Sequence, residues 1–358
     1  MRVAIRGVGV TSPAGPDLDS FARWWREGRH PKTGPSAHLA REAFAPAKTV
    51  GEVLGFRARN HIPDRKSIKL MFPRVKLGIA AAMEAWAGGV AGVGPERRAM
   101  YAACGLTVDE DWTFREAMYA AAPEGEEFDL ARFGEVGQGM LNPLWLVKGL
   151  SNNVLAFVAR FEEITGPNDN FMGGATGALQ CLDAAASALA AGRADVALAG
   201  ASDSLVTVED SMAFAKYGAL EDGVIPSQGG GFVRLERGEP GEFGVLGVAT
   251  GIAPVGPDGS PWRPEGMDAA LDAVAERAWA QAGMPRVAEA RLVGPRVPSE
   301  GASADLWSHL GDPGAAAGGW MLAAAWMLRT EDGVRGPIEL AIADPNGELA
   351  VAVLGTLS

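Results

Sequence analysis

The segment from Gly166 to Asp203 has the residue order of a nucleophile elbow. It reads GPNDNFMGGATGALQCLDAAASALAAGRADVALAGASD: a polar strand, two glycines, a helix of small residues and a second apolar strand. Such a strand, turn and helix hold a nucleophile at a helix N-terminus, where free N–H groups and the helix dipole stabilise negative charge. The turn itself reads Met-Gly-Gly-Ala-Thr over residues 172–176, with no Ser, Cys or Thr at its tip. The sequence therefore predicts the support for a nucleophile without the nucleophile.

The two cysteines do not replace it. Cys181 lies seven residues after Gly174, two helical turns along the predicted helix and roughly 10 Å from the turn. Cys104 ends an apolar strand. We interpret both as buried structural thiols, because free cysteine packs as a small apolar residue. Two cysteines form no disulfide framework, which favours a reducing compartment.

Composition excludes several classes of function. The chain has 358 residues, 47% of them apolar, and a formal net charge of −12. This acidic balance argues against nucleic-acid binding, which needs clustered Lys and Arg. No apolar run reaches the ~18 residues of a membrane span, and the N-terminus reads as a strand and turn instead of a signal peptide. We expect a cytoplasmic protein without a cofactor or a metal.

The remaining elements repeat one arrangement twice. A strand, a small-residue helix and further strands occur in residues 1–238 and, in shorter form, in residues 239–358, with a Gly- and Pro-rich seam around Gly238–Glu265. The second small-residue helix covers Gly314–Leu328. Helices so poor in bulk can pack closely between two sheets. The sequence therefore predicts an α/β fold with αβαβα layers, and two domains at these bounds.

Two local predictions concern neighbouring elements. The strands in GGGFVRLERG and GVLGVATGIAPVG are expected to form a hairpin-like pair. The segment NPLWLVKGLSNNVLAFVARFEEITG is expected to form one helix before the elbow.

Three segments resemble β-ketoacyl-ACP synthases of the thiolase fold. VAIRGVGVTSPAG (Val3–Gly15) is similar to their opening strand and turn, and Asn142–Phe171 to the segment before their nucleophile. Gly173–Ser204 matches their elbow, central helix and following strand. The resemblance continues more weakly to the C-terminus. It implies a thiolase-like layered αβαβα fold made of two related halves.

The departures from this family fall on its catalytic positions. Members carry a catalytic Cys where this sequence has Gly174. Their first histidine follows a strand in Ala-His-Gly-Thr, and that place here reads LVGPRVPSEGASAD. Their second lies in Gly-His-x-x-Gly-Ala-Ala-Gly, where HLGDPGAAAGG offers Gly311 or Asp312. Their Gly-Phe-Gly-Gly loop has become ADPNGELA. The thiolate that carries the acyl group and the imidazoles that drive decarboxylation are both missing, so this chain alone should not condense anything.

The resemblance also implies surfaces for partners. The strand residues Asn168, Asn170, Phe171 and Met172 correspond to the dimer seam. The plain interpretation of the basic segment RARNHIPDRKSIKLMFPRVK is a solvent-exposed helix face. The alternative is a surface that docks an acidic acyl carrier protein, for which Arg65, Lys66 and Lys69 are the candidates.

The acidic stretch Asp109–Glu135 follows a predicted strand. In related dimers it runs near the two-fold axis. Trp112, Phe114 and Met118 are therefore candidates for the floor of an acyl tunnel, with ordinary core or interface packing as the alternative.

Two hypotheses of function follow. The first is a chain length factor: a non-catalytic subunit that pairs with an active ketosynthase, binds no cofactor and helps to set acyl chain length in type II polyketide, polyene or fatty-acid-like biosynthesis. The second is a homodimeric enzyme with new acid–base chemistry on acyl thioesters, for which Glu300, His309 and Asp312 are the candidates. His309 lies two residues before the family's histidine position. A scaffold that binds no acyl group stays a third possibility.

Overall fold

The central feature of the structure is a mixed β-sheet. The computed structural model describes residues 2–37, 39–41, 45–88, 90–105, 112–122, 126–216, 218–253, 267–295, 297–298 and 300–358. In these residues nine strands form one sheet. From edge to edge they are β5 (Asn168–Phe171), β4 (Arg98–Cys104), β6 (Val196–Ser204), β7 (Gln228–Arg237), β1 (Val3–Thr11), β8 (Phe243–Ile252), β11 (Glu348–Thr356), β10 (Ile338–Ala343) and β9 (Ala290–Val293). A separate antiparallel pair joins β2 (Gly34–Pro35) to β3 (Thr49–Val50).

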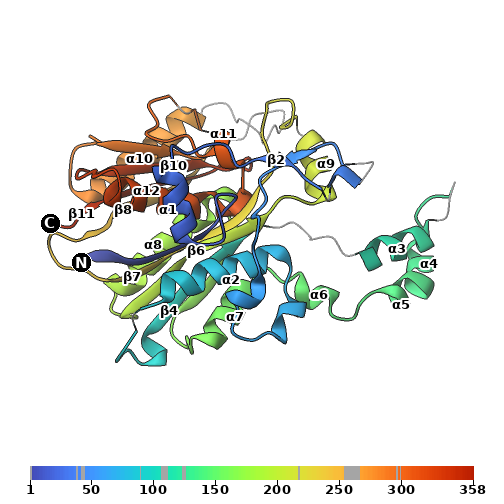
Figure 1. Ribbon diagram of the computed structural model, residues 1–358. Coiled ribbons are helices and arrows are strands. Elements are labelled where there is room, and N and C mark those ends of the chain that lie inside the picture. The colour runs from blue at the N-terminus through green and yellow to red at the C-terminus, as the bar shows by residue number, and fades with distance from the viewer. Residues whose placement is uncertain are drawn as a thin grey trace.

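The sheet consists of two halves that meet at β1 and β8. The register between these strands covers Val3 with Val245 and Ala4 with Gly244. On one side β4 pairs in parallel with β5 and β6, and on the other β9 pairs in parallel with β10. Because β1 and β8 are joined over so short a stretch, the two halves can separate beyond it and enclose helices between them (Figure 1).

Two helices fill the space between the halves, and others cover the outside. The central helix α8 (Gly177–Ala190) packs on β4 and β6 and also on β8 and β11. The second central helix, α12 (Ala317–Thr330), packs on β7 and β1 and also on β9 and β10. On the outer faces, α2 (Pro73–Trp86) packs on β1, β6 and β7, and α10 (Met267–Ala282) packs on β8 and β11 (Figure 1). The layered αβαβα fold expected from the sequence is confirmed. The helices of this body are α1 (Leu18–Arg26), α2 (Pro73–Trp86), α7 (Asn153–Phe161), α8 (Gly177–Ala190), α9 (Val208–Lys216), α10 (Met267–Ala282), α11 (Trp307–Leu310) and α12 (Ala317–Thr330).

Small residues allow the central helices to approach their neighbours closely. A Cβ atom at Gly319 of α12 would lie 2.5 Å from the carbonyl oxygen of Gly231 in β7. A Cβ atom at Gly318 would lie 3.0 Å from the Cβ of Ala178 in α8. Larger side chains would push α12 away from both neighbours, which is the physical reason for the Ala/Gly-rich pattern.

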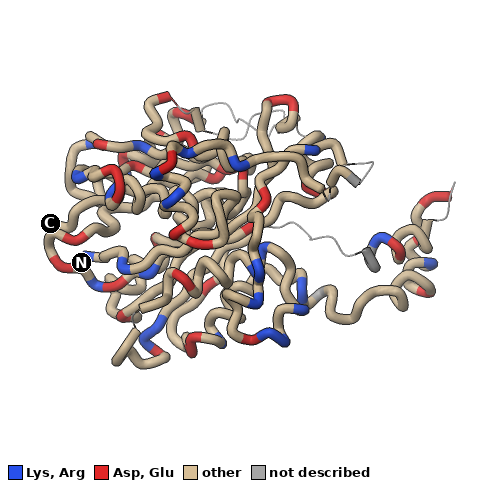
Figure 2. Tube along the Cα trace, in the orientation of Figure 1, with Lys and Arg blue, Asp and Glu red and all other residues tan. Residues whose placement is uncertain are grey.

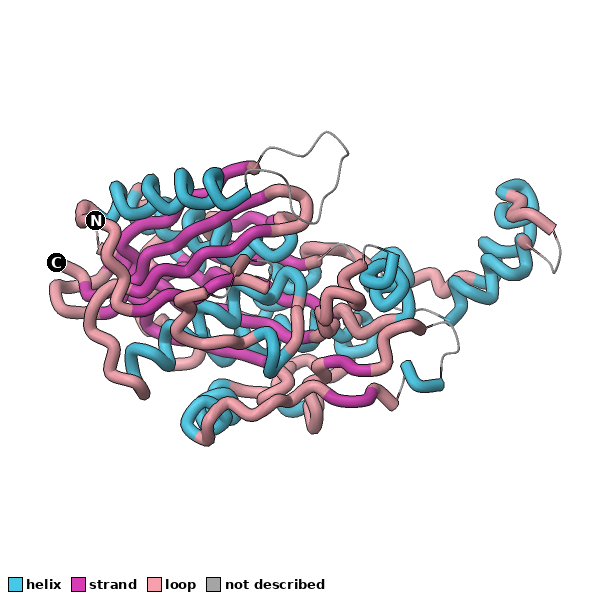
Figure 3. The backbone as a smooth tube through the Cα atoms, turned by 90° about the horizontal axis from the view of Figure 1, so that it is seen from above, coloured by secondary structure: helices cyan, strands magenta, loops and turns pink. Residues whose placement is uncertain are grey.

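A helical arm projects from this body. It contains α3 (Trp112–Ala121), α4 (Leu130–Arg132), a π-helical turn (Phe133–Gly137), α5 (Gln138–Met140) and α6 (Trp145–Lys148), and it extends away from the sheet in both views (Figures 1 and 3). The arm leaves the body after β4 and returns through α7 to β5. Its exposed apolar side chains, counting those up to the start of α7, are Tyr119, Phe128, Leu130, Val136, Met140, Leu144, Val147 and Leu150.

Two local predictions were wrong. The strands β7 and β8 are not neighbours, because β1 lies between them. The register of β1 with β7 pairs Val3 with Arg237, so the strand that separates them comes from the distant N-terminus.

The expected single helix before the elbow is two helices, α6 and α7. The side-chain amide of Asn153 donates hydrogen bonds to the carbonyl oxygens of Val147 (2.7 Å) and Lys148 (3.0 Å). These bonds satisfy carbonyl groups at the end of α6, so the helix can stop there and a new one begin.

Candidate functional site

The elbow has the predicted geometry. The edge strand β5 ends at Phe171, a short 3₁₀ turn covers Gly174–Thr176, and α8 follows at Gly177. Gly174 has a φ of +51°, in the left-handed region that favours glycine. The turn thus presents backbone where a nucleophile would present a side chain.

A carboxylate from the other half of the molecule lies against this turn. The Oδ2 atom of Asp344, just after β10, accepts a hydrogen bond from the backbone N–H of Ala175 at 2.8 Å. A Cβ atom placed on Gly174 would lie 2.1 Å from the same oxygen. The side chain of Asp344 is buried, with the residue 6% exposed. The place of a nucleophile is therefore filled by an anionic group that already uses an N–H group of the turn.

Further polar groups surround the turn. The hydroxyl of Thr176 donates to the carbonyl oxygen of Gly173 (2.7 Å) and lies 3.2 Å from Oε2 of Glu348, while the amide of Gln180 donates to this hydroxyl (3.1 Å). Burial raises the pKa of Glu348, and the charge of Asp344 adds to this effect. The surroundings of the turn are therefore acidic.

The second central helix begins in the same way. Gly314 has a φ of +56° and starts a 3₁₀ turn that leads into α12. The Oδ2 atom of Asp203 accepts a hydrogen bond from the backbone N–H of Ala315 at 3.1 Å. Burial raises the pKa of Asp203 to about 6. The two 3₁₀ turns contact each other, so the N-termini of α8 and α12 meet at the centre of the molecule.

Sequence reasoning missed Asp203 and Asp344. In the sequence, the loop ADPNGELA stands out because it lacks the family's Gly-Phe-Gly-Gly motif, which gives no role to Asp344 within it. The signal in the sequence was an Asp at or just after the end of a buried strand in each half. Because the carboxyl ends of strands in layered α/β folds often border a site, these acids were candidates to contact the elbow.

The three residues considered for new acid–base chemistry lie in different surroundings. Glu300 is exposed and lines a pocket with Asp268 and Arg291. His309 is half-buried on α11, and its Nδ1 lies 2.8 Å from the carbonyl oxygen of Asp305. Asp312 is buried, and its Oδ1 accepts a hydrogen bond from the N–H of Gly314 at 2.9 Å.

The candidates for a tunnel floor lie on the arm. Helix α3 begins at Trp112, and the side chains of Trp112 and Phe114 lie outside the described part of the structure. Met118 is half-buried on the same helix. The arm has a small core of its own, in which Ala117 and Ala121 are fully buried.

The residues expected at a dimer seam lie on an open sheet edge. In the part of the chain that the structure describes, strand β5 pairs with β4 on one side and is the last strand of the sheet on the other. Asn168 is exposed, Asn170 and Phe171 are half-buried, and Met172 is 50% exposed. Such an edge offers backbone N–H and C=O groups for pairing.

The basic residues expected to dock a carrier protein are exposed. Arg65, Lys66 and Lys69 lie in or beside the 3₁₀ turn Ser67–Leu70, and basic segments gather beside α6 and α7 (Figure 2). The nearby acid, Asp64, accepts hydrogen bonds from the Ser67 hydroxyl and from Arg160, which hold its pKa at about 2. Its charge is therefore already compensated within this surface.

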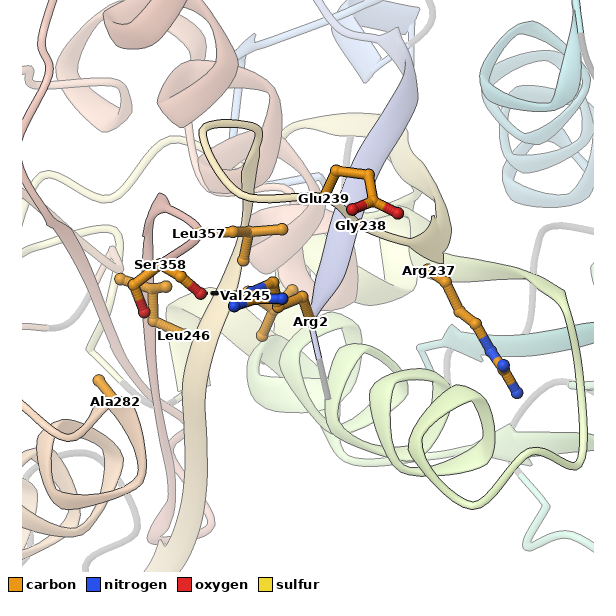
Figure 4. A pocket seen from close by; sticks show the side chains of 9 residues that line it. All are labelled: Arg2, Arg237, Gly238, Glu239, Val245, Leu246, Ala282, Leu357 and Ser358. Carbon is orange, nitrogen blue, oxygen red and sulfur yellow. Dashed lines mark hydrogen bonds between the residues drawn. The ribbon is translucent and has the colours of Figure 1, made fainter.

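A pocket of about 580 Å³ lies at a different place, beside both chain ends (Figure 4). It is open, and none of its lining residues belongs to the elbow. Its lining comes from strand residues, from the segments beside the strands and from the last residue of α10: Arg2, Arg237, Gly238, Glu239, Val245, Leu246, Ala282, Leu357 and Ser358.

The described residues lack two features of other protein classes. No group of three His, Cys, Asp or Glu side chains there could hold a metal ion. None of the helices described is long and apolar enough to cross a membrane.

Comparisons with known proteins agree on the fold. The family model described as "Beta-ketoacyl synthase, N-terminal domain" matches residues 1–240. No curated protein matches the sequence. Among solved structures, the chain is similar to "The ishigamide ketosynthase/chain length factor" (TM-score 0.75, 20% identity, 100% of both chains covered). It is also similar to a structure titled "AntDE:AntF (apo): type II PKS acyl-carrier protein in complex with its ketosynthase bound to the hexaketide" (TM-score 0.78, 16% identity, 100% of this chain and 99% of that one). A third is a β-ketoacyl synthase from Burkholderia phymatum STM815 (TM-score 0.75, 14% identity, 100% of both chains).

Proposed function

Because the chain belongs to the β-ketoacyl synthase family, we propose that it is a non-catalytic subunit of the chain length factor type. It pairs with an active β-ketoacyl-ACP synthase and shapes the acyl tunnel in type II polyketide, polyene or fatty-acid-like biosynthesis. The observation that carries this proposal is the elbow: Gly174 has no side chain to acylate, and the Asp344 carboxylate lies where that side chain would be.

The chemistry of condensation explains why this matters. The acyl group must be held on a thiolate, and the oxyanion formed at its carbonyl must be stabilised by hydrogen-bond donors. Here the N–H of Ala175 already donates to Asp344. A negative carboxylate at this point would also repel a developing oxyanion. The chain therefore keeps the fold of a ketosynthase without its chemistry.

The open edge of the sheet supports pairing with another subunit. Within the described residues, strand β5 has one neighbour, β4, and the exposed Met172 follows its last residue. An unpaired edge with an apolar side chain is unfavourable in water, and a second subunit that added its own edge strand would satisfy both.

The arm supports a role beside a partner's tunnel. It projects away from the body (Figure 3). Among its described residues, eight large apolar side chains up to Leu150 are exposed. The segment after α6 is also linked to the sheet edge, since the amide of Asn170 donates to the hydroxyl of Ser151 at 3.3 Å. A subunit that paired at β5 would therefore lie within reach of the base of the arm, and Trp112, Phe114 and Met118 would be the side chains to test for tunnel length.

The titles of two similar structures fit this proposal. One names a ketosynthase/chain length factor, and the other names a ketosynthase bound to an acyl-carrier protein. The exposed Arg65, Lys66 and Lys69 offer the positive charge that an acidic carrier protein needs.

The experiment that tests the proposal is coexpression with a ketosynthase encoded beside this chain, followed by native mass spectrometry of the purified product. A one-to-one heterodimer is expected. A homodimer that ignores the ketosynthase would overturn the proposal. It would direct attention to binding of acyl thioesters and to Glu300, His309 and Asp312.

A further inference from the structure

We propose that Asp344 is an internal plug of the elbow: its carboxylate occupies the space beside Gly174. A thiol introduced at position 174 therefore becomes a reactive nucleophile only when Asp344 is also replaced. This inference goes beyond the proposed function, because it concerns how the inactive state is maintained. It rests on the contacts of two residues and on a second, equivalent turn in the same chain.

The first step is steric. A Cβ atom on Gly174 would lie 2.1 Å from Oδ2 and 2.8 Å from Cγ of Asp344, closer than any normal contact. Either the carboxylate or the turn would have to move. The φ of +51° at Gly174 adds backbone strain to any side chain placed there.

The carboxylate is held in place from several sides. The backbone N–H of Asp344 donates to the carbonyl oxygen of Glu348 (2.8 Å), and its carbonyl oxygen accepts from Gly347 (2.9 Å). Its Oδ1 accepts from the N–H of Asn346 (3.0 Å), and its Oδ2 accepts from Ala175 (2.8 Å). A side chain with both oxygens bonded and its backbone paired cannot move aside without losing hydrogen bonds.

The second step is electrostatic. The first N–H groups of a helix have no partner inside it and attract anions. In this chain the Ala175 N–H, next to α8, is already bonded to a carboxylate, and Ala175 is buried. A thioester oxyanion would compete for this donor and meet a like charge. The plug therefore acts against acyl transfer even if a thiol were supplied.

The turn before α12 contains the same combination of a glycine and a buried carboxylate. At Gly314, a Cβ atom would lie 2.6 Å from Oδ2 of Asp203, and this oxygen bonds the N–H of Ala315. The same pair of glycine and carboxylate thus begins α12. The elbow has the form of a structural helix cap in which glycine and acid are required together.

The test uses the full-length chain with four forms: wild type, Gly174→Cys, Asp344→Ala and the double variant. Each is treated with iodoacetamide across a range of pH, and alkylation is followed by intact mass. Beside Asp344 a thiol at position 174 meets a negative charge that opposes its ionisation. Without Asp344 it lies at a helix N-terminus, which favours the thiolate. We expect the double variant to be alkylated about tenfold faster near pH 7 than Gly174→Cys, with its pH profile shifted downward.

The native thiols provide the background. Cys104 and Cys181 are buried, and burial raises the pKa of Cys181 further above its usual range. Wild type and Asp344→Ala report any alkylation at these two positions. Equal rates and equal pH profiles for Gly174→Cys and the double variant would overturn the proposal.

A second measurement covers variants that fold poorly. Thermal unfolding midpoints are compared for Gly174→Ala with and without Asp344→Ala, and for Gly314→Ala with and without Asp344→Ala. We expect removal of Asp344 to raise the midpoint of Gly174→Ala but not that of the matched control Gly314→Ala, whose turn contacts Asp203. If Asp344→Ala lowered the unfolding midpoint by the same amount in the Gly174→Ala and Gly314→Ala proteins, the proposed coupling between Asp344 and Gly174 would be overturned. Neither measurement involves a ketosynthase, so this inference and the proposed function fail separately.

Discussion

Asp203 and Asp344 occupy equivalent positions in the two halves, and each caps the central helix of the other half. Asp203 is the penultimate residue of β6, the third strand from the centre of the sheet on one side, and Asp344 follows β10, the third on the other. Asp203 bonds the N–H of Ala315 before α12, and Asp344 bonds the N–H of Ala175 before α8. Two reciprocal hydrogen bonds therefore connect the two halves.

A buried acid on α2 gives the first prediction. Glu84 accepts hydrogen bonds from the N–H groups of Val10 (3.0 Å) and Leu18 (2.8 Å), and burial raises its pKa to about 7. In the unfolded chain its pKa is the ordinary 4.5. The folded state therefore holds the proton more tightly, and its contribution to stability is lost as pH rises from about 4.5 to about 7. We expect this loss to be about 3 kcal/mol in urea unfolding, because each unit of pKa difference corresponds to about 1.4 kcal/mol.

The Glu84→Gln variant should lack this part of the pH dependence, since a neutral amide cannot titrate. The exposed Glu27→Gln variant is the matched control and should follow wild type. If Glu84→Gln and wild type keep a constant difference in unfolding free energy between pH 4 and pH 8, the interpretation of Glu84 is wrong.

The close approach of α12 to β7 gives the second prediction. A Cβ atom at Gly231 would lie 2.4 Å from the carbonyl carbon of Gly319, and both are backbone positions that cannot move aside. Gly231→Ala should therefore lower the free energy of unfolding by at least about 2 kcal/mol. The control is Gly139→Ala on α5, where nothing lies within 4 Å of the new Cβ; it should be neutral or stabilising by up to about 1 kcal/mol. Chemical denaturation of the three proteins measures both.

The sequence predicts structure formed by neighbouring residues better than contacts between residues that are far apart along the chain. The strand, turn and helix around Gly174 are contiguous, and their pattern predicted the elbow correctly. The position of β1 between β7 and β8 was missed, because it joins residues at opposite ends of the first half. Asp344 was missed for the same reason, since its bond to Ala175 spans 169 positions. Apolar periodicity reports which face of an element is buried but not which distant residue covers it.

The exposed end of β5 gives the third prediction. Met172→Glu places a charge at the proposed seam, where burial without a partner is unfavourable. We expect the heterodimer with the ketosynthase to dissociate at least about tenfold more readily, measured by native mass spectrometry on dilution. Met212→Glu on α9 is the matched control, because Met212 is 53% exposed and Met172 is 50% exposed. Equal weakening by both substitutions would argue against β5 as the seam.

The basic surface gives the fourth prediction. Reversing the charge of Lys66 and Lys69 together should weaken binding of an acyl carrier protein about tenfold at low salt, with a smaller difference at high salt because exposed charges are screened. Titration calorimetry at two salt concentrations measures this. The control is Arg23→Glu, an exposed basic residue on α1. An unchanged dissociation constant for the double reversal would place carrier docking elsewhere.

The arm gives the fifth prediction. If the α3 residues border the tunnel, Trp112→Ala or Phe114→Ala in the heterodimer should lengthen the product by about one extender unit, because a smaller side chain leaves a deeper pocket. Tyr119→Ala on the same helix is the control, since Tyr119 is 68% exposed. Products are compared by mass spectrometry. The same product length from all three variants would mean that α3 does not line the tunnel.

The position of β1 in the sheet has a consequence for the folding of this chain during its synthesis on the ribosome. Among the described strands β1 leaves the ribosome first, yet its neighbours β7 and β8 are the last strand made in the first half and the first made in the second, and Val3 pairs with Arg237. At about 5–20 residues per second, this apolar strand waits roughly 10–50 s for its partner. During that time both of its edges are open to other chains. Newly made chains should therefore depend on chaperones, or on rapid capture by a partner, more than the stability of the finished fold would suggest.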